Sequence, residues 1–137
     1  MLNPDQILIV QETYLTFAAN AQRTGKLFYD RLFEIDPTLR PLFKGDIDAQ
    51  SVKLMQMVGT AVNALRKPSL LTNAVGELGK RHVNYGVKAQ HYETVGEALI
   101  YAIKSQLKDG FTNDVESAWR AVYGELARIS IEASGMN

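Results

Sequence analysis

The sequence predicts an all-α protein made of one domain. Apolar residues recur every three or four positions along most of the chain, which is the spacing of an amphipathic helix. No stretch of useful length alternates between apolar and polar residues as a half-buried strand does. The 137 residues are enough for one hydrophobic core. We therefore expect residues 1–137 to form a single helical domain.

The order of the expected elements follows from helix caps and breakers. Asn3-Pro4 is typical of an N-cap followed by the first helical residue, and Asp36-Pro37 is typical of a break between helices. The expected elements are a helix from Pro4 to about Asn20, a second from about Ala21 to Ile35, a short helical turn from Pro37 to Phe43, a loop from Lys44 to Asp48, a third helix from about Ala49 that ends before Pro68, a fourth from about Leu71 to Val83, a fifth that ends at Asp109-Gly110, and a sixth that opens at Thr112.

Each long helix has one apolar face that we expect to be buried. In the third helix that face also carries Gln50, one turn before Leu54. The expected core residues of the third, fifth and sixth helices are Leu54, Met57, Val58, Ala61 and Leu65, then Tyr92, Val95, Leu99 and Ile103, and finally Val115, Trp119, Val122, Leu126 and Ile129.

Composition excludes several classes of function. Lysine plus arginine and aspartate plus glutamate number 15 each, so no net field favours nucleic acid or an anionic membrane as a partner. Cysteine is absent, which excludes disulfides, thiolate metal sites and a cysteine nucleophile. The early apolar run ILIV, residues 7–10, is too short for a signal sequence or a membrane span. We expect a cytoplasmic protein.

Common catalytic motifs are also missing, and the remaining candidate for chemistry is a histidine. The sequence has no GxGxxG, GxxxxGK[ST], GxSxG or HExxH motif. His82 lies near the end of the fourth expected helix, where Nδ1 could donate to a carbonyl of the preceding turn and leave Nε2 free. One imidazole is a poor zinc site but suffices for haem, because the porphyrin supplies four nitrogens. A core histidine without a ligand role is the alternative.

Several strings, in their order along the chain, resemble the globin family. FYDRLFEIDPTLRPLF (28–43) is similar to the globin second helix and proline corner, DAQSVKLMQMVG (48–59) to the distal helix, and LxxxH (78–82) to the proximal helix. LFYDRLF, HYETVGEAL and AWRAVYGELA are most similar to single-domain bacterial globins and the haem domain of flavohaemoglobins. The resemblance implies a globin fold of six to eight helices around a haem pocket that holds haem b, iron protoporphyrin IX.

The resemblance also assigns roles to single residues. It implies His82 as the iron ligand, Tyr29 and Gln50 as the ligand-stabilising pair on the distal side, and Gly25 against Ser51 as the small residues of a close helix crossing. The implied haem contacts are Phe43, Lys53 (toward a propionate), Leu54, Met57, His82, Val87, Tyr92 and Val95. Without the resemblance, spacing favours an ordinary core tyrosine at Tyr29 and a surface amide at Gln50. His91 matches no functional position, and we expect it near a helix start, partly exposed and away from iron.

The chain departs from flavohaemoglobins on the proximal side. There the family pairs a tyrosine, here Tyr92, with a glutamate of the final helix that strengthens the iron ligand. The ungapped match puts Ser134 at the glutamate position, with Glu132 two residues earlier. A hydroxyl does not supply the missing charge, so we expect a weaker electron push toward O–O chemistry.

These residues favour high-affinity binding of O₂ and of other diatomic ligands such as NO and CO. The alternative is a nitric oxide dioxygenase that converts NO to nitrate and depends on a separate reductase, because the 137 residues hold no flavin or nicotinamide domain. A haem sensor or a haem-free regulatory globin is a third hypothesis. The sequence leaves the oligomeric state open.

Overall fold

The computed structural model describes residues 2–43, 45–84 and 88–135, and it describes the side chains of these residues except 82–84. Helices make up its regular structure, and no strand occurs in the described residues, which confirms the all-α prediction. The elements in order are α1 (Pro4–Ala18), α2 (Ala21–Ile35), η1 (Pro37–Leu42), α3 (Ile47–Asn63), α4 (Pro68–Asn84), α5 (Ala89–Leu107), η2 (Lys108–Gly110) and α6 (Asn113–Ser134). Within these residues, no helix is both long and apolar enough to cross a membrane.

Two of the expected helix starts were wrong, and local caps explain both. Helix α3 begins at Ile47 rather than Ala49, because the Asp46 carboxylate accepts a hydrogen bond from the Asp48 amide at 3.1 Å and closes the first turn early. Helix α4 begins at Pro68 rather than Leu71, because proline suits the first helical position. The expected loop after Phe43 is correspondingly shorter.

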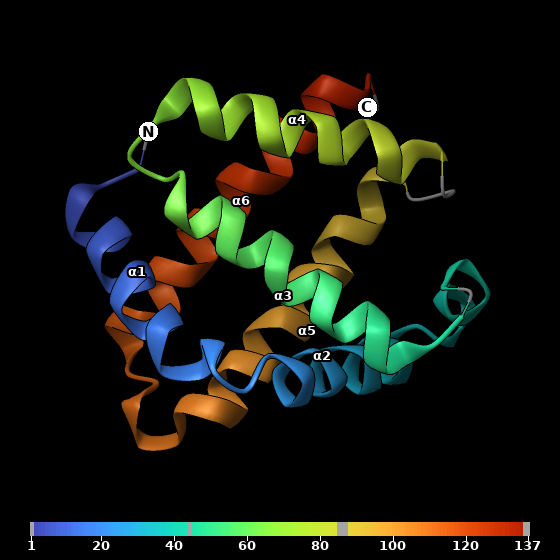
Figure 1. Cartoon of the computed structure of the whole chain (residues 1–137), viewed down its shortest axis with the longest axis horizontal. Helices are drawn as coiled ribbons and strands as arrows, with labels where there is room; N and C mark the ends of the chain where they lie inside the picture. The colour runs from blue at the N-terminus through green and yellow to red at the C-terminus, as the bar shows by residue number, and fades with distance from the viewer. Residues whose placement is uncertain (1, 44, 85–87, 136–137) are drawn as a thin grey trace.

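Helix α4 stands apart from the helices on the other side of the molecule. In Figure 1, α4 lies along the top and α2 along the bottom, with α3 running diagonally between them. Helix α2 packs on α3 and α5, whereas α4 packs chiefly on α6 and makes few contacts with α3. The two helices that carry Gln50 and His82 are therefore held by different neighbours.

The core lies where α1, α2, α5 and α6 meet. Trp119 is buried as predicted, and its indole nitrogen donates to the Thr13 hydroxyl of α1 at 2.9 Å. Burial is also confirmed for Val115, Val122, Ile129, Leu99, Ile103, Ala61 and Leu65. Leu126, Leu54, Met57, Val58, Tyr92 and Val95 are only half-buried, which corrects the expectation for these six side chains.

Two pairs of helices approach to backbone contact at a glycine. At the Gly25 crossing, of α2 with α3, a Cβ on Gly25 would lie 2.5 Å from the Ser51 Cβ, which confirms the predicted small-residue pair. At the Gly79 crossing, of α4 with α6, a Cβ on Gly79 would lie 2.3 Å from the Ser130 carbonyl oxygen. Real Cβ atoms do not come so close to other atoms, so both crossings require glycine.

Candidate functional site

Tyr29 lies in the middle of an aromatic cluster built by α2 and the residue after η1. Its ring is 4.9 Å from that of Phe28, 6.0 Å from that of Phe33 and 5.2 Å from that of Phe43, measured between centroids. Only 4% of Tyr29 is exposed, and burial raises the pKa of its phenol to about 12. The phenol therefore stays protonated, and able to donate a hydrogen bond, throughout the physiological pH range.

The hydroxyl of Tyr29 is available to a guest molecule. Among the residues that the structure describes, no group is hydrogen-bonded to it. The residue is almost fully buried, but its hydroxyl is not among the polar side-chain atoms that are buried without a partner, so a small ligand can reach it. This arrangement distinguishes Tyr29 from an ordinary core tyrosine that bonds to its own protein.

Phe43 borders the same cluster from the end of η1. It is half-buried, and its ring stands 5.6 Å from that of Phe33 in an edge-to-face arrangement. The Arg40 guanidinium lies over the Phe33 ring, 4.9 Å from its centroid. The sequence analysis missed Phe33, although its position one helical turn after Tyr29 is a signal that could have found it.

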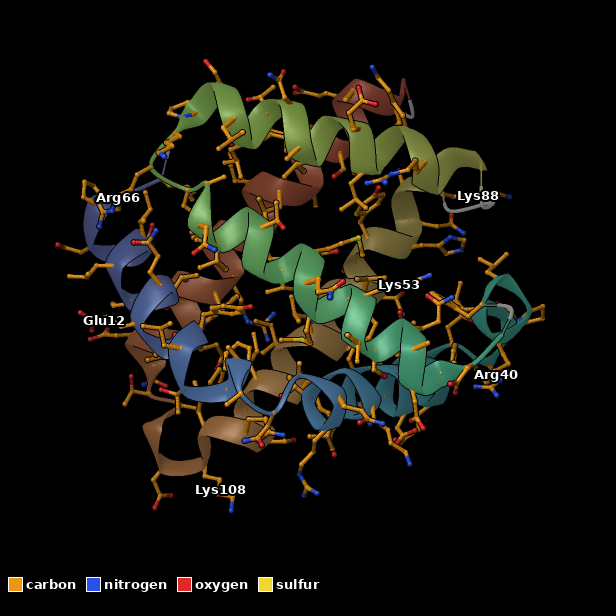
Figure 2. All side chains as sticks on the ribbon, in the orientation of Figure 1. Glu12, Arg40, Lys53, Arg66, Lys88 and Lys108 are labelled. Carbon is orange, nitrogen blue, oxygen red and sulfur yellow. The ribbon has the colours of Figure 1, made fainter. Side chains whose placement is uncertain are left out.

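Helix α3 brings the next set of predicted residues onto one face. Gln50, Leu54 and Met57 follow one another at helical spacing, and each is half-buried. Lys53 is exposed, and Figure 2 shows it in the same half of the view as Arg40 and Lys88. The structure thus groups an amide with apolar side chains and leaves the lysine at the surface.

The two histidines have different surroundings. His82 belongs to the last turn of α4, one turn after Gly79, and its side chain lies outside the described residues, as does the whole of Val87. His91 is half-exposed in the first turn of α5, where its Nδ1 accepts a hydrogen bond from the Lys88 amide at 2.9 Å. The expected place of His91, at a helix start and partly exposed, is confirmed.

Comparison with known proteins identifies the family. The sequence profile described as Globin matches residues 26–129, which is most of the chain. This chain belongs to the globin family. A solved hexacoordinated heme protein from an anhydrobiotic tardigrade has the same fold, with a TM-score of 0.90 over 98% of this globin and 96% of that chain, at 17% identity.

Curated relatives of this globin are flavohemoproteins. The flavohemoprotein of Vibrio cholerae is 28% identical over 98% of this chain, and that of Bordetella pertussis is 33% identical over 96%. The globin covers 35% and 33% of these two proteins, so it spans about a third of their length. This agrees with the resemblance to the haem domain of flavohaemoglobins.

The proximal side of this globin differs from the ungapped match. Ser134 donates to the Ile131 carbonyl of its own helix at 2.8 Å, and the exposed Glu132 pairs with Arg128 at 2.9 Å. The side chain of Ser130, one turn earlier, interacts with the Tyr92 hydroxyl. Burial raises the pKa of Tyr92, and this contact with Ser130 lowers it. Ser130 thus contacts Tyr92, and Ser134 at the glutamate position stays a prediction of the ungapped match.

Tyr92 is also held through its backbone. The Tyr123 hydroxyl donates to the Tyr92 carbonyl at 2.6 Å, and burial raises the pKa of Tyr123 well above its usual value. The Tyr123 ring fills the space beside Gly96, where a Cβ would lie 2.7 Å from it. Val95, the neighbouring residue of α5, is half-buried. Helix α6 thus fixes the start of α5 at two polar side chains.

Proposed function

We propose that this globin is a single-domain haem protein that binds O₂ with high affinity and also accepts NO and CO. The observation that carries the proposal is Tyr29, whose ring is packed among aromatic rings while its hydroxyl stays accessible and makes no hydrogen bond to another described residue. A phenol in these surroundings can donate a hydrogen bond to a small ligand that carries negative charge on its outer atom, and this bond strengthens binding.

The described side chains fit haem b as the group that brings the ligand there. A porphyrin is flat and mostly apolar, so it needs apolar side chains that are not already fully buried. The half-buried apolar side chains that could contact it are Phe43, three residues of α3 (Leu54, Met57 and Val58) and Val95 of α5. His82 would supply the iron ligand, and the exposed Lys53 would pair with a propionate. Haem supplies reversible binding of diatomic gases through its ferrous iron.

Tyr29 and Gln50 would then set the strength of binding. Each would donate a hydrogen bond, the tyrosine from its hydroxyl and the glutamine from its amide, to the charge that O₂ acquires on binding. A hydrogen bond to a charged acceptor contributes about 1.5–3 kcal/mol, so two of them slow O₂ release by about 10² to 10⁴. Slow release suits scavenging or chemistry better than delivery.

Nitric oxide dioxygenation is the second candidate function, and the flavohemoprotein relatives favour it. In this reaction O₂ and NO combine to nitrate and one electron restores the ferrous state. The same Tyr29 and Gln50 would hold the O₂ until NO arrives. Under this proposal a separate reductase supplies the electron.

One stopped-flow experiment separates the two candidates. Haem-loaded globin in air-saturated buffer is mixed with excess NO, with and without a flavin reductase and NADH. Nitrate formation that stops after one equivalent per haem, even with reductase present, supports binding as the function. Turnover that continues for many equivalents only with reductase supports the dioxygenase. A protein that takes up no haem contradicts both.

A further inference from the structure

Three small polar residues are buried in the described part of the chain, and the hydroxyl of one of them reaches another helix. The three are Thr24, Ser51 and Ser130. The Ser51 hydroxyl returns to its own helix and donates to the Ile47 carbonyl at 2.8 Å, as serines in helices commonly do. The Ser130 hydroxyl instead points from α6 to the Val75 carbonyl of α4, at 3.4 Å. Small size explains Ser51 fully, but it does not explain where the Ser130 hydroxyl points.

Ser130 stands where α4 approaches α6 most closely. The backbone of Ser130 lies against Gly79, and one turn away a Cβ on Gly76 would meet the Ala133 Cβ at 3.2 Å. Gly79 comes one turn before His82, and Val75 one turn before Gly79, on the same helix. Any shift of α4 along or around α6 at this point moves residue 82 with it.

The same hydroxyl also reaches α5. Ser130 is the α6 side chain that interacts with the buried Tyr92 hydroxyl. The contact lies outside the distance and angle limits of a full hydrogen bond, and so it is a loose one. Ser130 therefore stands at a junction of α4, α5 and α6, with two oxygen atoms of the neighbouring helices beside its own.

We propose that Ser130 is a positioning residue, whose hydroxyl fixes α4 against α5 and thereby sets the orientation of the iron ligand at position 82. The proposal rests on the function proposed above, in which His82 binds haem iron. Ser130 acts through the helix and through Tyr92 and does not touch the ligand of the iron.

The test uses the haem-loaded globin and two matched alanine variants. Ser130→Ala removes the hydroxyl and keeps the close backbone contact with Gly79. Ser105→Ala removes the same group from α5, where the hydroxyl bonds to the Tyr101 carbonyl of its own helix at 2.9 Å. Two measurements are made on each: hydrogen exchange of the α4 amides around Gly79, and the iron–histidine stretching band of the deoxygenated ferrous protein. The first does not depend on haem chemistry.

The expected result is a difference between the two variants. In Ser130→Ala the α4 amides exchange about fivefold faster, the factor for one lost hydrogen bond, and the iron–histidine band shifts or broadens. Ser105→Ala leaves both unchanged. Exchange within twofold of wild type in Ser130→Ala, or an equal effect in Ser105→Ala, overturns the proposal. If wild type itself has no iron–histidine band, the assignment of His82 fails, while the exchange comparison still decides the role of Ser130.

Tyr92→Phe provides a second route to the same junction. It removes the phenol hydroxyl, and its effect on α4 exchange should not add to that of Ser130→Ala if the two hydroxyls act together. Full additivity in the double variant contradicts coupling through Tyr92. Should Ser130→Ala fail to hold haem, Tyr92→Phe is measured alone, and unchanged α4 exchange then counts against the proposal.

Discussion

The Gly25 crossing and the Gly79 crossing are built from the same two residue types, glycine and serine, but the serine hydroxyl has a different partner in each. In each, a glycine on one helix meets a serine on the other at a distance that excludes any side chain. At the Gly25 crossing the serine hydroxyl is satisfied within α3, and at the Gly79 crossing it contacts α4. The first crossing therefore positions side chains, Tyr29 and Gln50, whereas the second positions the backbone that carries His82.

The largest expected effect is the loss of haem when the proposed iron ligand on α4, His82, is removed. His82→Ala should lose stable haem, because no other protein ligand is proposed for the iron. His91→Ala is the matched control and should keep haem, since His91 serves as an acceptor for the Lys88 amide at the start of α5. Haem content per protein and the Soret band measure both. An unchanged Soret band in His82→Ala would contradict the assignment.

Replacing the glycine of either crossing by alanine should destabilise the fold. Gly25→Ala and Gly79→Ala should each lower the free energy of unfolding by about 1–3 kcal/mol or more, because the new Cβ meets backbone atoms that have little room to move. Gly124→Ala in α6 is the control, with no atom within 4 Å of the added Cβ. It should stabilise by about 0.5–1 kcal/mol. Urea unfolding of the three variants checks this, and a neutral Gly79→Ala would contradict the close contact.

The two crossings also differ in how far the sequence predicted them. Gly25 and Ser51 were found because the resemblance assigned both positions. Ser130 was missed, because Ser130 and Ser134 are one turn apart on the same face of α6 and local spacing does not distinguish them. Gly79 packs against Ser130, and this contact depends on the position of α6 along α4, which local spacing does not predict.

Helix existence and order followed from apolar spacing, but two starts did not. The apolar residues begin later than the helices do. The N-cap Asp46 sets the first turn of α3, and Pro68 is itself the first residue of α4. The half-buried state of Leu54 and Val95 also escaped prediction, because periodicity marks the inward face of a helix and not whether another helix covers it. These uncovered apolar side chains are the ones proposed to contact haem.

The O₂ dissociation rate should show how much the Tyr29 hydroxyl contributes to ligand binding. Tyr29→Phe removes the donor that acts only once O₂ carries charge, so the O₂ dissociation rate should rise about 10- to 150-fold, with little change in association. The CO dissociation rate should rise less, because CO carries little charge on its outer atom. Stopped-flow and flash photolysis give the four rates. Equal changes for both gases would indicate a loosened pocket instead.

Alkaline pH should reveal the buried phenol of Tyr29 directly. Its pKa is raised from 10.0 to about 12, so above pH 10 the unfolded chain loses this proton first and stability falls with rising pH until about pH 12. At pH 11 this amounts to about 1.4 kcal/mol. Tyr29→Phe should lose that much less stability between pH 9 and pH 11 than wild type. Parallel pH profiles of unfolding for the two proteins would contradict the burial of the phenol.

The smallest expected effect is at Ser51, and it sharpens the contrast with Ser130. Ser51→Ala keeps the close approach to Gly25 and removes a hydroxyl that only supplements the helix, because the Ile47 carbonyl retains its backbone partner. The free energy of unfolding should change by less than about 0.5 kcal/mol, and the O₂ dissociation rate should stay within twofold of wild type. Denaturant unfolding and stopped-flow measure the two quantities. A loss as large as that of Ser130→Ala would mean that a buried hydroxyl matters equally at both crossings, and the functional difference between them would then have to come from Tyr29 and Gln50 alone.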